Sequence, residues 1–362
     1  MKAALLRDIS RRMEIEDVAI AQPQAHEVLV RIAAVGVCHS DLHVLDGSMP
    51  HPFPVVLGHE AAGIVEQVGA EVRHVRLGDH VVVCLAFHCG HCIQCQSGNS
   101  HRCLPPEAAR PAKDTPRLIC EEIPVTQFCN MGAFAELMLV HESGCVAIRK
   151  DMPLDRACLL GCAVATGFGA VSRSAGVRPG DTVAVVGCGG VGLSAIAAAR
   201  LAGAAQVIAV DRLPVKLDMA RNFGATDVVD ASDGNAVAGV MSATGGRGVN
   251  HALEAIGRKD TIEMAFGMLA KGGTATVIGI AKPGDKIEIP ALALLRETSL
   301  RGSNMGGVRT AIDIPYYVEL YMQGRLPLDQ LISQRLKLEQ INEAFEDLRK
   351  GEVARSVIMF DV

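Results

Sequence analysis

The stretch TVAVVGCGGVG, residues Thr182 to Gly192, decides how the middle of this chain folds. An apolar strand pattern runs directly into a turn with glycines at 187, 189 and 192, and the helical pattern LSAIAAARLAG follows at once. At the N-terminus of a helix, free backbone N–H groups bind phosphate. The stretch therefore predicts a turn that holds the pyrophosphate of a dinucleotide.

The next strand pattern supports this prediction. QVIAV ends at Asp211, about 20 residues after the turn, where an acidic side chain accepts hydrogen bonds from the ribose hydroxyls of adenosine. Because a carboxylate there also repels a 2′-phosphate, we expect NAD rather than NADP. The alternative is a plain glycine turn with a helix-capping or solvated aspartate, and the ordered strand, turn, helix and strand argue against it.

Outside this stretch, the chain shows two different sequence patterns in two different regions. From about Pro179 to Leu300, apolar strands such as DVVD and TATVIGI alternate with helical stretches, which predicts a parallel sheet covered on both faces. Before about Val140, short β-rich runs separated by Gly, Pro and Asp turns predict a mostly antiparallel, barrel-like half. An amphipathic helix in LEQINEAFEDLRKG and a strand in SVIMF close the chain.

The fold class that follows is α/β, with one domain inserted in another. We expect a doubly wound parallel sheet over residues 164–300, inserted in a mostly β domain made of residues 1–163 and 301–362. A chain of 362 residues is too long for one ordinary core, in agreement with two domains.

Composition excludes several classes of protein. A net charge of -5 gives no support for a nucleic-acid partner. The N-terminal MKAALLRDISRRM lacks the apolar core of a secretory signal, and no apolar run reaches the roughly 20 residues that a membrane span needs. We therefore expect a cytoplasmic protein with no membrane partner.

A dense group of cysteines lies in CGHCIQCQSGNSHRC, residues 89–103. Cys89, Cys92, Cys95 and Cys103 follow the spacing C-x2-C-x2-C-x7-C, and in a reducing compartment such a group favours a metal over disulfides. Four thiolates close a tetrahedral zinc sphere, so the zinc would be structural. An iron–sulfur cluster also suits the short spacings, and four free thiols are the third alternative. A zinc-ribbon module that binds nucleic acid is disfavoured, because Arg102 is the only Lys or Arg in the stretch.

Three further motifs contain possible metal ligands: Cys38 in GVCHSDLHVLDG, His59 in VVLGHEAAG and Cys162 in LLGCAVATGFGA. Taken singly, a buried Cys or His is more often an ordinary core residue. Together with the cysteine group and GCGGVG in the same order, the three motifs resemble the zinc-dependent medium-chain alcohol dehydrogenases over essentially the whole chain. That family implies a GroES-like catalytic domain with a Rossmann domain inserted.

The resemblance implies a catalytic zinc ion besides the structural one, hence two zinc ions per chain. Cys38, His59 and Cys162 resemble its ligands, which leave a fourth position open for water or alcohol. Glu60 resembles an exchangeable or neighbouring ligand, and Asp41 resembles the carboxylate that orients the liganding histidine.

The resemblance also implies roles in proton transfer and cofactor binding. Ser40 and His43 resemble a relay in which the hydroxyl takes the proton of the alcohol and the cofactor ribose passes it to the imidazole. The positions that resemble cofactor contacts are Thr166 for the nicotinamide, Lys216 for the ribose, Arg355 for the pyrophosphate, and His39, also for the pyrophosphate, where many members have Arg. For Ser40 the alternative is a turn serine, and for His43, Lys216 and Arg355 it is a solvated side chain.

The implied function is the reversible oxidation of a small alcohol, primary or secondary, to an aldehyde or ketone with NAD. Met49, Leu85, Phe128 and Cys129 align with substrate-pocket positions and predict a mainly apolar pocket, although ordinary core residues would have the same pattern. A homodimer is expected, because the segment between Cys103 and Phe134 is long, as in dimeric members.

Two alternatives remain open. One is a thiol-adduct-dependent formaldehyde dehydrogenase, although Met49 and Glu107 replace the residues that mark the glutathione-dependent branch. The other is a non-catalytic relative that retains the cofactor.

Overall fold

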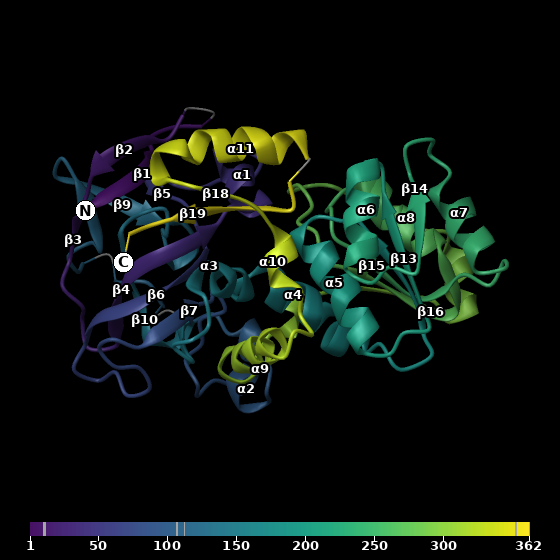
Figure 1. Cartoon of the computed structure of the whole chain (residues 1–362), viewed down its shortest axis with the longest axis horizontal. Coiled ribbons are helices and arrows are strands. Elements are labelled where there is room, and N and C mark those ends of the chain that lie inside the picture. The colour runs from purple at the N-terminus through teal and green to yellow at the C-terminus, as the bar shows by residue number, and fades with distance from the viewer. Residues whose placement is uncertain (10–11, 106–107, 112, 352, 362) are drawn as a thin grey trace. The chain divides into compact units, whose positions relative to one another are not determined.

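The computed structural model describes residues 1–9, 12–105, 108–111, 113–351 and 353–361. These residues form two compact units (Figure 1). The first unit combines Met1–Cys162 with Arg309–Val362, and the second is Ala163–Val308.

Two β-sheets build the first unit. The strands of the larger sheet are β4 (Glu27–Gly36), β6 (Glu60–Val68), β7 (His80–Val83), β10 (Leu137–His141), β11 (Cys145–Ile148), β18 (Ile332–Leu336) and β19 (Arg355–Met359). Their order is β11-β7-β6-β4-β19-β18, and β10 also pairs with β4. The strands of the smaller sheet are β1 (Lys2–Leu6), β2 (Glu14–Asp17), β3 (Ala19–Ile20), β5 (Val55–Val56), β8 (Leu118–Cys120) and β9 (Ile123–Gln127). Their order is β2-β1-β5-β9-β8-β3.

Strand β4 organises the larger sheet, because every residue in it except Arg31 is buried. It pairs antiparallel with β6, β10 and β19. The pairing with β19 sets Val357 opposite Gly36, so the C-terminal strand lies beside the end of β4. This register brings Arg355 near the residues that follow β4.

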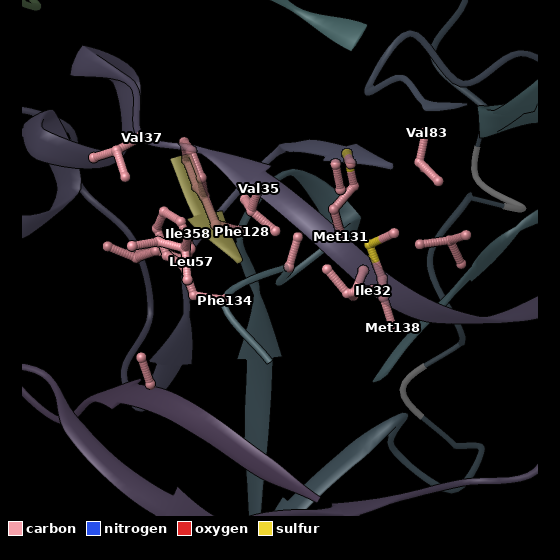
Figure 2. Close-up of a cluster of buried hydrophobic side chains, with 14 of the residues drawn as sticks. Ile32, Val35, Val37, Leu57, Val83, Phe128, Met131, Phe134, Met138 and Ile358 are labelled. Carbon is pink, nitrogen blue, oxygen red and sulfur yellow. The ribbon is translucent and has the colours of Figure 1, made fainter. Parts of the chain in front are cut away.

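The core of the first unit packs against β4. Figure 2 shows Ile32 and Val35 of this strand among Met131, Phe134 and Met138, all of them buried. Each side chain of this size contributes about 1.5–3 kcal/mol when it leaves water. The core therefore holds β4, and the residues that follow it, in a fixed place.

The helices of the first unit are α1 (His39–Leu45), α2 (Ile93–Gln96), α3 (Leu154–Ala157), α9 (Thr310–Met322), α10 (Leu328–Leu331) and α11 (Ile341–Lys350). The predicted amphipathic helix is α11, whose buried residues are Ile341, Ala344, Phe345 and Leu348, on one face of a helix. It ends at Gly351, which has φ of 78° and so adopts the left-handed conformation that favours glycine. The predicted closing strand is β19.

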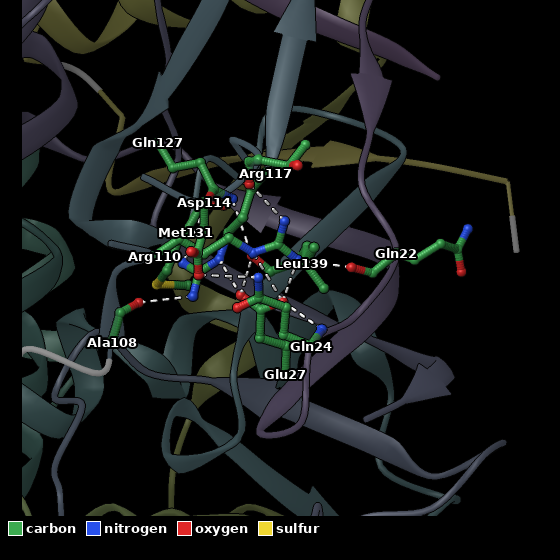
Figure 3. Close-up of polar contacts among 11 residues, drawn as sticks. Gln22, Gln24, Glu27, Ala108, Arg110, Asp114, Arg117, Gln127, Met131 and Leu139 are labelled. Carbon is green, nitrogen blue, oxygen red and sulfur yellow. Dashed lines mark hydrogen bonds and ion pairs between the residues drawn. The ribbon is translucent and has the colours of Figure 1, made fainter. Parts of the chain in front are cut away.

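A buried charge cluster ties the segment after Cys103 to β4 (Figure 3). Oε1 of Glu27 accepts hydrogen bonds from Nε of Arg110 at 2.9 Å and Nε of Arg117 at 2.8 Å. Arg117 also donates to the carbonyl of Ala108, and Arg110 to the carbonyl of Thr115. The cluster therefore holds Arg110 and Arg117, on the described part of this segment, against β4.

The second unit is a parallel sheet with the strand order β14-β13-β12-β15-β16-β17. Its strands are β12 (Thr182–Val186), β13 (Gln206–Asp211), β14 (Asp227–Asp230), β15 (Val249–Glu254), β16 (Leu269–Val277) and β17 (Ser299–Gly302). Its helices are α4 (Ala163–Gly169), α5 (Gly190–Leu201), α6 (Pro214–Asn222), α7 (Ala236–Ala243) and α8 (Lys259–Gly267). The chain runs outward from β12 in one direction and then from β15 in the other, which makes the sheet doubly wound. The predicted fold class is confirmed.

The units divide at 162/163 and 308/309, whereas the sequence placed the boundaries at 163/164 and 300/301. The second of these boundaries would cut β17, which pairs with β16 as the last strand of the parallel sheet. The strand is short and partly exposed, so its periodicity does not reveal which sheet it joins.

No single helix in the described ranges is long and apolar enough to cross a membrane, although the bent helix pair 154–161 and 163–175 reaches the required length and composition.

Candidate metal centres and cofactor site

Four buried side chains of the first unit meet at one point: Cys38, His59, Glu60 and Cys162. One ligand atom from each lies within 4.8 Å of all the others. Cys38 directly precedes α1, His59 and Glu60 lie at the start of β6, and Cys162 ends the first unit. The pairing of β4 with β6, which sets Gly36 opposite Glu60, brings two of these segments together.

The donor atoms fit a metal ion of the zinc type. Nδ1 of His59 lies 3.1 Å from Oδ1 of Asp41, whereas the buried Nε2 has no hydrogen-bond partner among the described residues. A ring with one nitrogen held by a carboxylate and the other directed at two thiols is the usual arrangement of a liganding histidine. Asp41 is itself fixed, because its Oδ1 accepts the N–H of Gly58 at 2.8 Å.

The pKa values of the two thiols at this site shift in opposite directions, because the hydrogen bond to Cys38 and burial raise the pKa of Cys162. A hydrogen bond from Cys162 and the positive charge of Arg355 lower the pKa of Cys38, against the effect of burial. Burial raises the pKa of Glu60 to about 7, although Arg355 counteracts it. The guanidinium of Arg355 lies 3.3 Å from the Glu60 carboxylate and 3.8 Å from Sγ of Cys38. The guanidinium of Arg355 therefore compensates negative charge on the buried side chains of Glu60 and Cys38.

The second group of cysteines forms a small lobe around α2. The four measured Sγ–Sγ distances between Cys89, Cys92, Cys95 and Cys103 are 3.6 to 4.0 Å. Four sulfurs at about 2.3 Å from a zinc ion lie about 3.8 Å apart, at the corners of a tetrahedron. The lobe therefore fits a closed four-thiolate zinc site.

In the second unit, the glycine turn lies between β12 and α5. Gly187 has φ of 93°, a conformation that favours glycine, and a Cβ on Gly192 would overlap with the carbonyl oxygen of Gly187. Gly189 is the N-cap of α5, so the first N–H groups of that helix lie at the turn. These features fit a pyrophosphate site.

Asp211 lies beside this turn at the end of β13. Its Oδ2 accepts the N–H of Cys188 at 2.8 Å, and its Oδ1 accepts the N–H of Leu213 at 3.1 Å. The carboxylate remains partly exposed. It is thus held at the turn with capacity to accept further hydrogen bonds.

Comparison with known proteins identifies the family. The family model "Alcohol dehydrogenase GroES-like domain" matches residues 24–150, and the family model "Zinc-binding dehydrogenase" matches residues 190–321. The alcohol dehydrogenase class-3 of Drosophila melanogaster is 38% identical over 368 residues, which cover 99% of this chain and 97% of that protein. This chain belongs to the zinc-dependent medium-chain alcohol dehydrogenases.

Solved structures agree with this assignment. An alcohol dehydrogenase zinc-binding domain protein from Burkholderia ambifaria is 37% identical with a TM-score of 0.94, covering 100% of this chain and 99% of that one. The benzyl alcohol dehydrogenase of Acinetobacter calcoaceticus is 34% identical with a TM-score of 0.93, covering 99% of both chains. These structures support the same family, the zinc-dependent alcohol dehydrogenases.

Helix α1 of the dehydrogenase presents three of the expected site residues. Ser40 follows Cys38 closely, and its Oγ lies 3.9 Å from Sγ of Cys38. His43 lies in the last turn of the helix and is half-buried, whereas His39 is exposed at the first position. Ser40 and His43 are three residues apart and so share a face of the helix.

The remaining expected cofactor residues divide between the two units. Thr166 and Lys216 belong to the second unit, as the glycine turn does, and both are buried. Thr166 donates a hydrogen bond to Sδ of Met305 at 3.6 Å, and its helix α4 packs so closely on α5 that a Cβ on Gly167 would lie 2.6 Å from the carbonyl oxygen of Val191. Arg355 belongs to the first unit, where its guanidinium donates a hydrogen bond to the Glu60 carboxylate. Its contact with a pyrophosphate stays a prediction.

Two features of the metal centre were missed from the sequence. One is the Arg355–Glu60 pair, which joins residues 295 positions apart. The other is Gly36, where a Cβ would overlap with Oε2 of Glu60. Gly36 does lie two residues before Cys38, but no local pattern reveals what approaches it. Glu107, one of the two residues that differ from the glutathione-dependent branch, lies outside the described residues.

Proposed function

We propose that this dehydrogenase oxidises apolar alcohols, aliphatic or aromatic and mainly primary, to aldehydes or ketones with NAD, and catalyses the reverse reaction. The observation that supports this most is an apolar surface beside the metal ligands. The ring of buried Phe128 lies edge-on to the ring of His59, with centroids 5.5 Å apart. A substrate bound next to His59 therefore lies close to an aromatic side chain.

Other apolar residues that align with pocket positions pack against the same core. Met49, Leu85 and Cys129 are half-buried and pack against the core cluster that contains Phe128. Burial raises the pKa of Cys129 to about 11, so its thiol is neutral at physiological pH. An apolar alcohol such as benzyl alcohol matches this surface better than a polyol does.

The residues of α1 supply proton transfer in this proposal. When zinc and NAD are bound, the metal lowers the pKa of a hydroxyl group towards neutrality and the nicotinamide accepts a hydride. Oγ of Ser40, beside Cys38, takes the proton of the alcohol, and the imidazole of His43 passes it towards solvent. Asp41 keeps His59 oriented throughout, through the contact at Nδ1.

We further propose two zinc ions per chain. Cys38, His59 and Cys162 hold the catalytic ion with an open fourth position, and Glu60 is the neighbouring carboxylate that can exchange with them. The four cysteines of the lobe hold the structural ion. The Sγ–Sγ distances in the lobe support the second site, and the unpartnered Nε2 of His59 supports the first.

The cofactor in this proposal is NAD, bound at Gly187, Gly189 and Gly192. The carboxylate of Asp211 accepts hydrogen bonds from the hydroxyls of the adenosine ribose. Lys216 contacts the ribose, and Thr166 contacts the nicotinamide. His39 and Arg355 contact the pyrophosphate. The position of the Asp211 carboxylate at the glycine turn supports the preference for NAD.

We also propose a homodimer. Leu292, Leu294 and Leu295 are 50–82% exposed in the turn that precedes β17. Strand β17 is the last strand in the sheet order, so one of its edges can pair with a second copy. All twelve cysteines are free of disulfides, which supports the expectation of a reducing, cytoplasmic location.

A panel of substrates tests the proposed reaction. NADH formation, followed by its near-ultraviolet absorbance, should be faster with benzyl and medium-length aliphatic alcohols than with glycerol, and should stop after chelation of the metal. Formaldehyde with glutathione or another low-molecular-weight thiol serves as the competing substrate, because the 38% identical relative is a class-3 alcohol dehydrogenase. A higher kcat/KM for the thiol adduct than for every free alcohol would favour a thiol-adduct-dependent formaldehyde dehydrogenase over a dehydrogenase of free alcohols. No turnover with any of them would favour a non-catalytic relative.

A further inference from the structure

Gln127, the last residue of β9, has a side chain that the proposed reaction does not use (Figure 3). Its Nε2 donates hydrogen bonds to the carbonyl of Met131 at 2.7 Å and to the carbonyl of Leu139 at 3.2 Å. Its Oε1 accepts a hydrogen bond from Nη1 of Arg117 at 3.4 Å. Only the nitrogen of the amide can face two carbonyl oxygens, so these contacts fix its orientation. One amide thus ties the residues that follow β9 to β10 and to the buried charge cluster.

The turn that this amide holds, residues 128–132, has an uncommon backbone. Cys129 and Asn130 have φ of 54° and 56°, in the left-handed region that favours glycine. Two successive non-glycine residues in this region cost free energy, so such a backbone persists only where its surroundings hold it. The hydrogen bond from Gln127 to Met131 joins the residue before the turn to a residue within it. It is therefore one of the contacts that maintain this conformation.

The same turn borders the segment that carries the proposed metal ligand His59. Directly after the turn, the N–H of Ala133 donates to the carbonyl of Gly58 at 3.0 Å. At the start of the turn, the ring of Phe128 lies edge-on to the ring of His59. The place of Phe128 beside the metal centre therefore depends on the conformation of the turn.

We propose that Gln127 is a positioning residue that sets the preference for aromatic alcohols. Its amide holds the turn 128–132 in the left-handed conformation, so that Phe128 and the half-buried Cys129 keep a fixed place beside His59. A surface that already has its bound conformation loses less entropy when a substrate binds, which increases affinity. The inference rests on the proposed oxidation of apolar alcohols next to His59.

Two variants separate the contacts of the amide. Gln127→Glu keeps an acceptor for Arg117 but sets a carboxylate oxygen against the two carbonyls, whereas Gln127→Met keeps the length of the side chain and removes every hydrogen bond. We expect both variants to lower kcat/KM for benzyl alcohol about tenfold through a higher KM, with kcat nearly unchanged, because lost ground-state binding appears in KM. Ethanol has no ring to place against the turn, so its kcat/KM should stay within about threefold of the wild type.

A double-mutant cycle with Phe128→Leu distinguishes positioning from a general loss of stability. The measured quantity is the ratio of kcat/KM for benzyl alcohol to that for ethanol. Gln127→Met should lower this ratio about tenfold when Phe128 is present, but less than about threefold in the Phe128→Leu background, because residues that act through one another are not additive. Melting temperature and zinc content, measured on all four proteins, show that each is folded. If Gln127→Met does not fold, Gln127→Glu takes its place in the cycle.

Gln206→Met is the matched control in the second unit. The Gln206 amide also donates to a backbone carbonyl, that of Ala243 at 3.1 Å, and to the Asp227 carboxylate at 3.0 Å. Gln206 begins β13, at the opposite end of that strand from Asp211. This variant should lower the melting temperature without changing the ratio of benzyl alcohol to ethanol.

Three outcomes would overturn the role of Gln127. They are a wild-type ratio in both Gln127 variants, a ratio that falls in Gln127→Met but not in Gln127→Glu, and the same fall with and without Phe128→Leu. The second outcome would assign the effect to the contact with Arg117 rather than to the turn. A wild-type protein that oxidises ethanol but no aromatic alcohol would overturn the proposed substrate class itself, so the two failures are distinguishable.

Discussion

At the scale of single residues, we expect the position of one carboxylate to decide the choice of cofactor. Asp211 accepts two backbone N–H groups near the glycine turn and still reaches solvent. Its negative charge lies where the 2′-phosphate of NADP would approach. The neighbouring Arg212 is exposed, so its charge is well solvated and competes weakly with that of Asp211.

Replacing Asp211 by glycine should therefore relax the preference for NAD. The variant loses the ribose acceptor and the repulsion of the 2′-phosphate, so the ratio of kcat/KM for NAD to that for NADP should fall by at least about tenfold. Steady-state kinetics with both cofactors give this ratio. Asp218→Asn, which removes an exposed carboxylate from α6, should leave it unchanged. An unchanged ratio in Asp211→Gly would refute the role of Asp211.

His39 is the second residue whose identity sets a cofactor property. It is exposed at the first position of α1. If it faces the pyrophosphate, His39→Arg supplies a permanent charge and should tighten NADH binding several-fold, a difference on the order of 1 kcal/mol. Slower release of NADH should lower kcat, while the single-turnover rate of hydride transfer stays the same.

Fluorescence titration of NADH between about pH 6 and 8 and rapid-quench kinetics measure the two effects of His39→Arg. Gln323→Arg adds the same charge at an exposed position after α9 and should change neither. Parallel binding curves for the wild type and His39→Arg would show that His39 does not contact the pyrophosphate.

At the scale of elements, the cysteine lobe and the buried metal centre depend on their ligands in different ways. The lobe contains the four-residue helix α2 and a short 3-10 turn, and none of the residues in these two elements is buried. Such a segment has almost no apolar core, so metal binding must supply its folding free energy. The buried centre, in contrast, lies at the ends of strands that the core of the first unit already holds.

Replacing one ligand at each site should therefore have opposite consequences. Cys103→Ser should lower the melting temperature or prevent accumulation of the protein, whereas Cys162→Ser should leave a folded, NADH-binding and inactive enzyme. Metal analysis by plasma mass spectrometry should give two zinc ions per wild-type chain and one per Cys162→Ser chain. One zinc ion per wild-type chain would refute the two-site proposal. Cys120→Ser, at a cysteine in neither group, is the control.

Buried ion pairs contribute to holding the described part of the segment between the lobe and β8. Burial opposes ionisation of Glu27, but hydrogen bonds from Arg110, the N–H of Gln24 and Arg117 outweigh it and lower the pKa of Glu27 below its ordinary 4.5. Glu27 is 4% exposed, and the side chains of both arginines are nearly as buried. Removing the carboxylate would leave two buried positive charges without their partner.

Glu27→Gln should therefore lower the free energy of unfolding by about 3 kcal/mol at pH 7. Since the pKa is lower in the folded protein, this contribution is complete above the ordinary pKa of about 4.5 and is lost as the pH falls through the folded value. Urea unfolding of both proteins from pH 7 to 4 should show a constant difference that narrows only at the acid end. Glu66→Gln, in an exposed pair with Arg31, should cost less than about 1 kcal/mol.

At the scale of the whole molecule, the exposed leucines next to β17 point to assembly. A strand with a free edge and large apolar side chains beside it is a ready surface for a second copy. We expect the wild type to sediment as a dimer. The double variant Leu292→Asp, Leu295→Asp should sediment as a monomer that keeps its zinc, because two buried charges at an interface cost several kcal/mol.

Sedimentation velocity at several concentrations distinguishes these states. Ile312→Asp together with Tyr316→Asp replaces two other exposed apolar residues, on α9, and should leave the dimer intact. A dimeric Leu292→Asp, Leu295→Asp variant would show that this surface is not the interface.

The sequence by itself determined the features that depend on local order. Strand, glycine turn and helix in TVAVVGCGGVG and its sequel predicted the parallel sheet, the spacing within the cysteine lobe predicted a four-thiolate group, and the 3.6-residue period of 341–348 predicted α11. Each of these signals lies within a few residues or one repeat of a helix or strand. Periodicity and turn chemistry are local properties, so a single amino-acid sequence is enough to predict the elements that depend on them.

Only the tertiary structure decided what long-range pairing brings together. The register of β19 on β4 sets Arg355 against Glu60, 295 residues earlier, and explains why Gly36 must lack a side chain. The addition of β17 to the parallel sheet moved the domain boundary from 300 to 308, and the contact of Ile256 with Gly187 depends on β15 lying next to β12. Strand register and side-chain contact across a sheet are set by the packing of the whole core, which leaves no signal at either partner's position in the sequence.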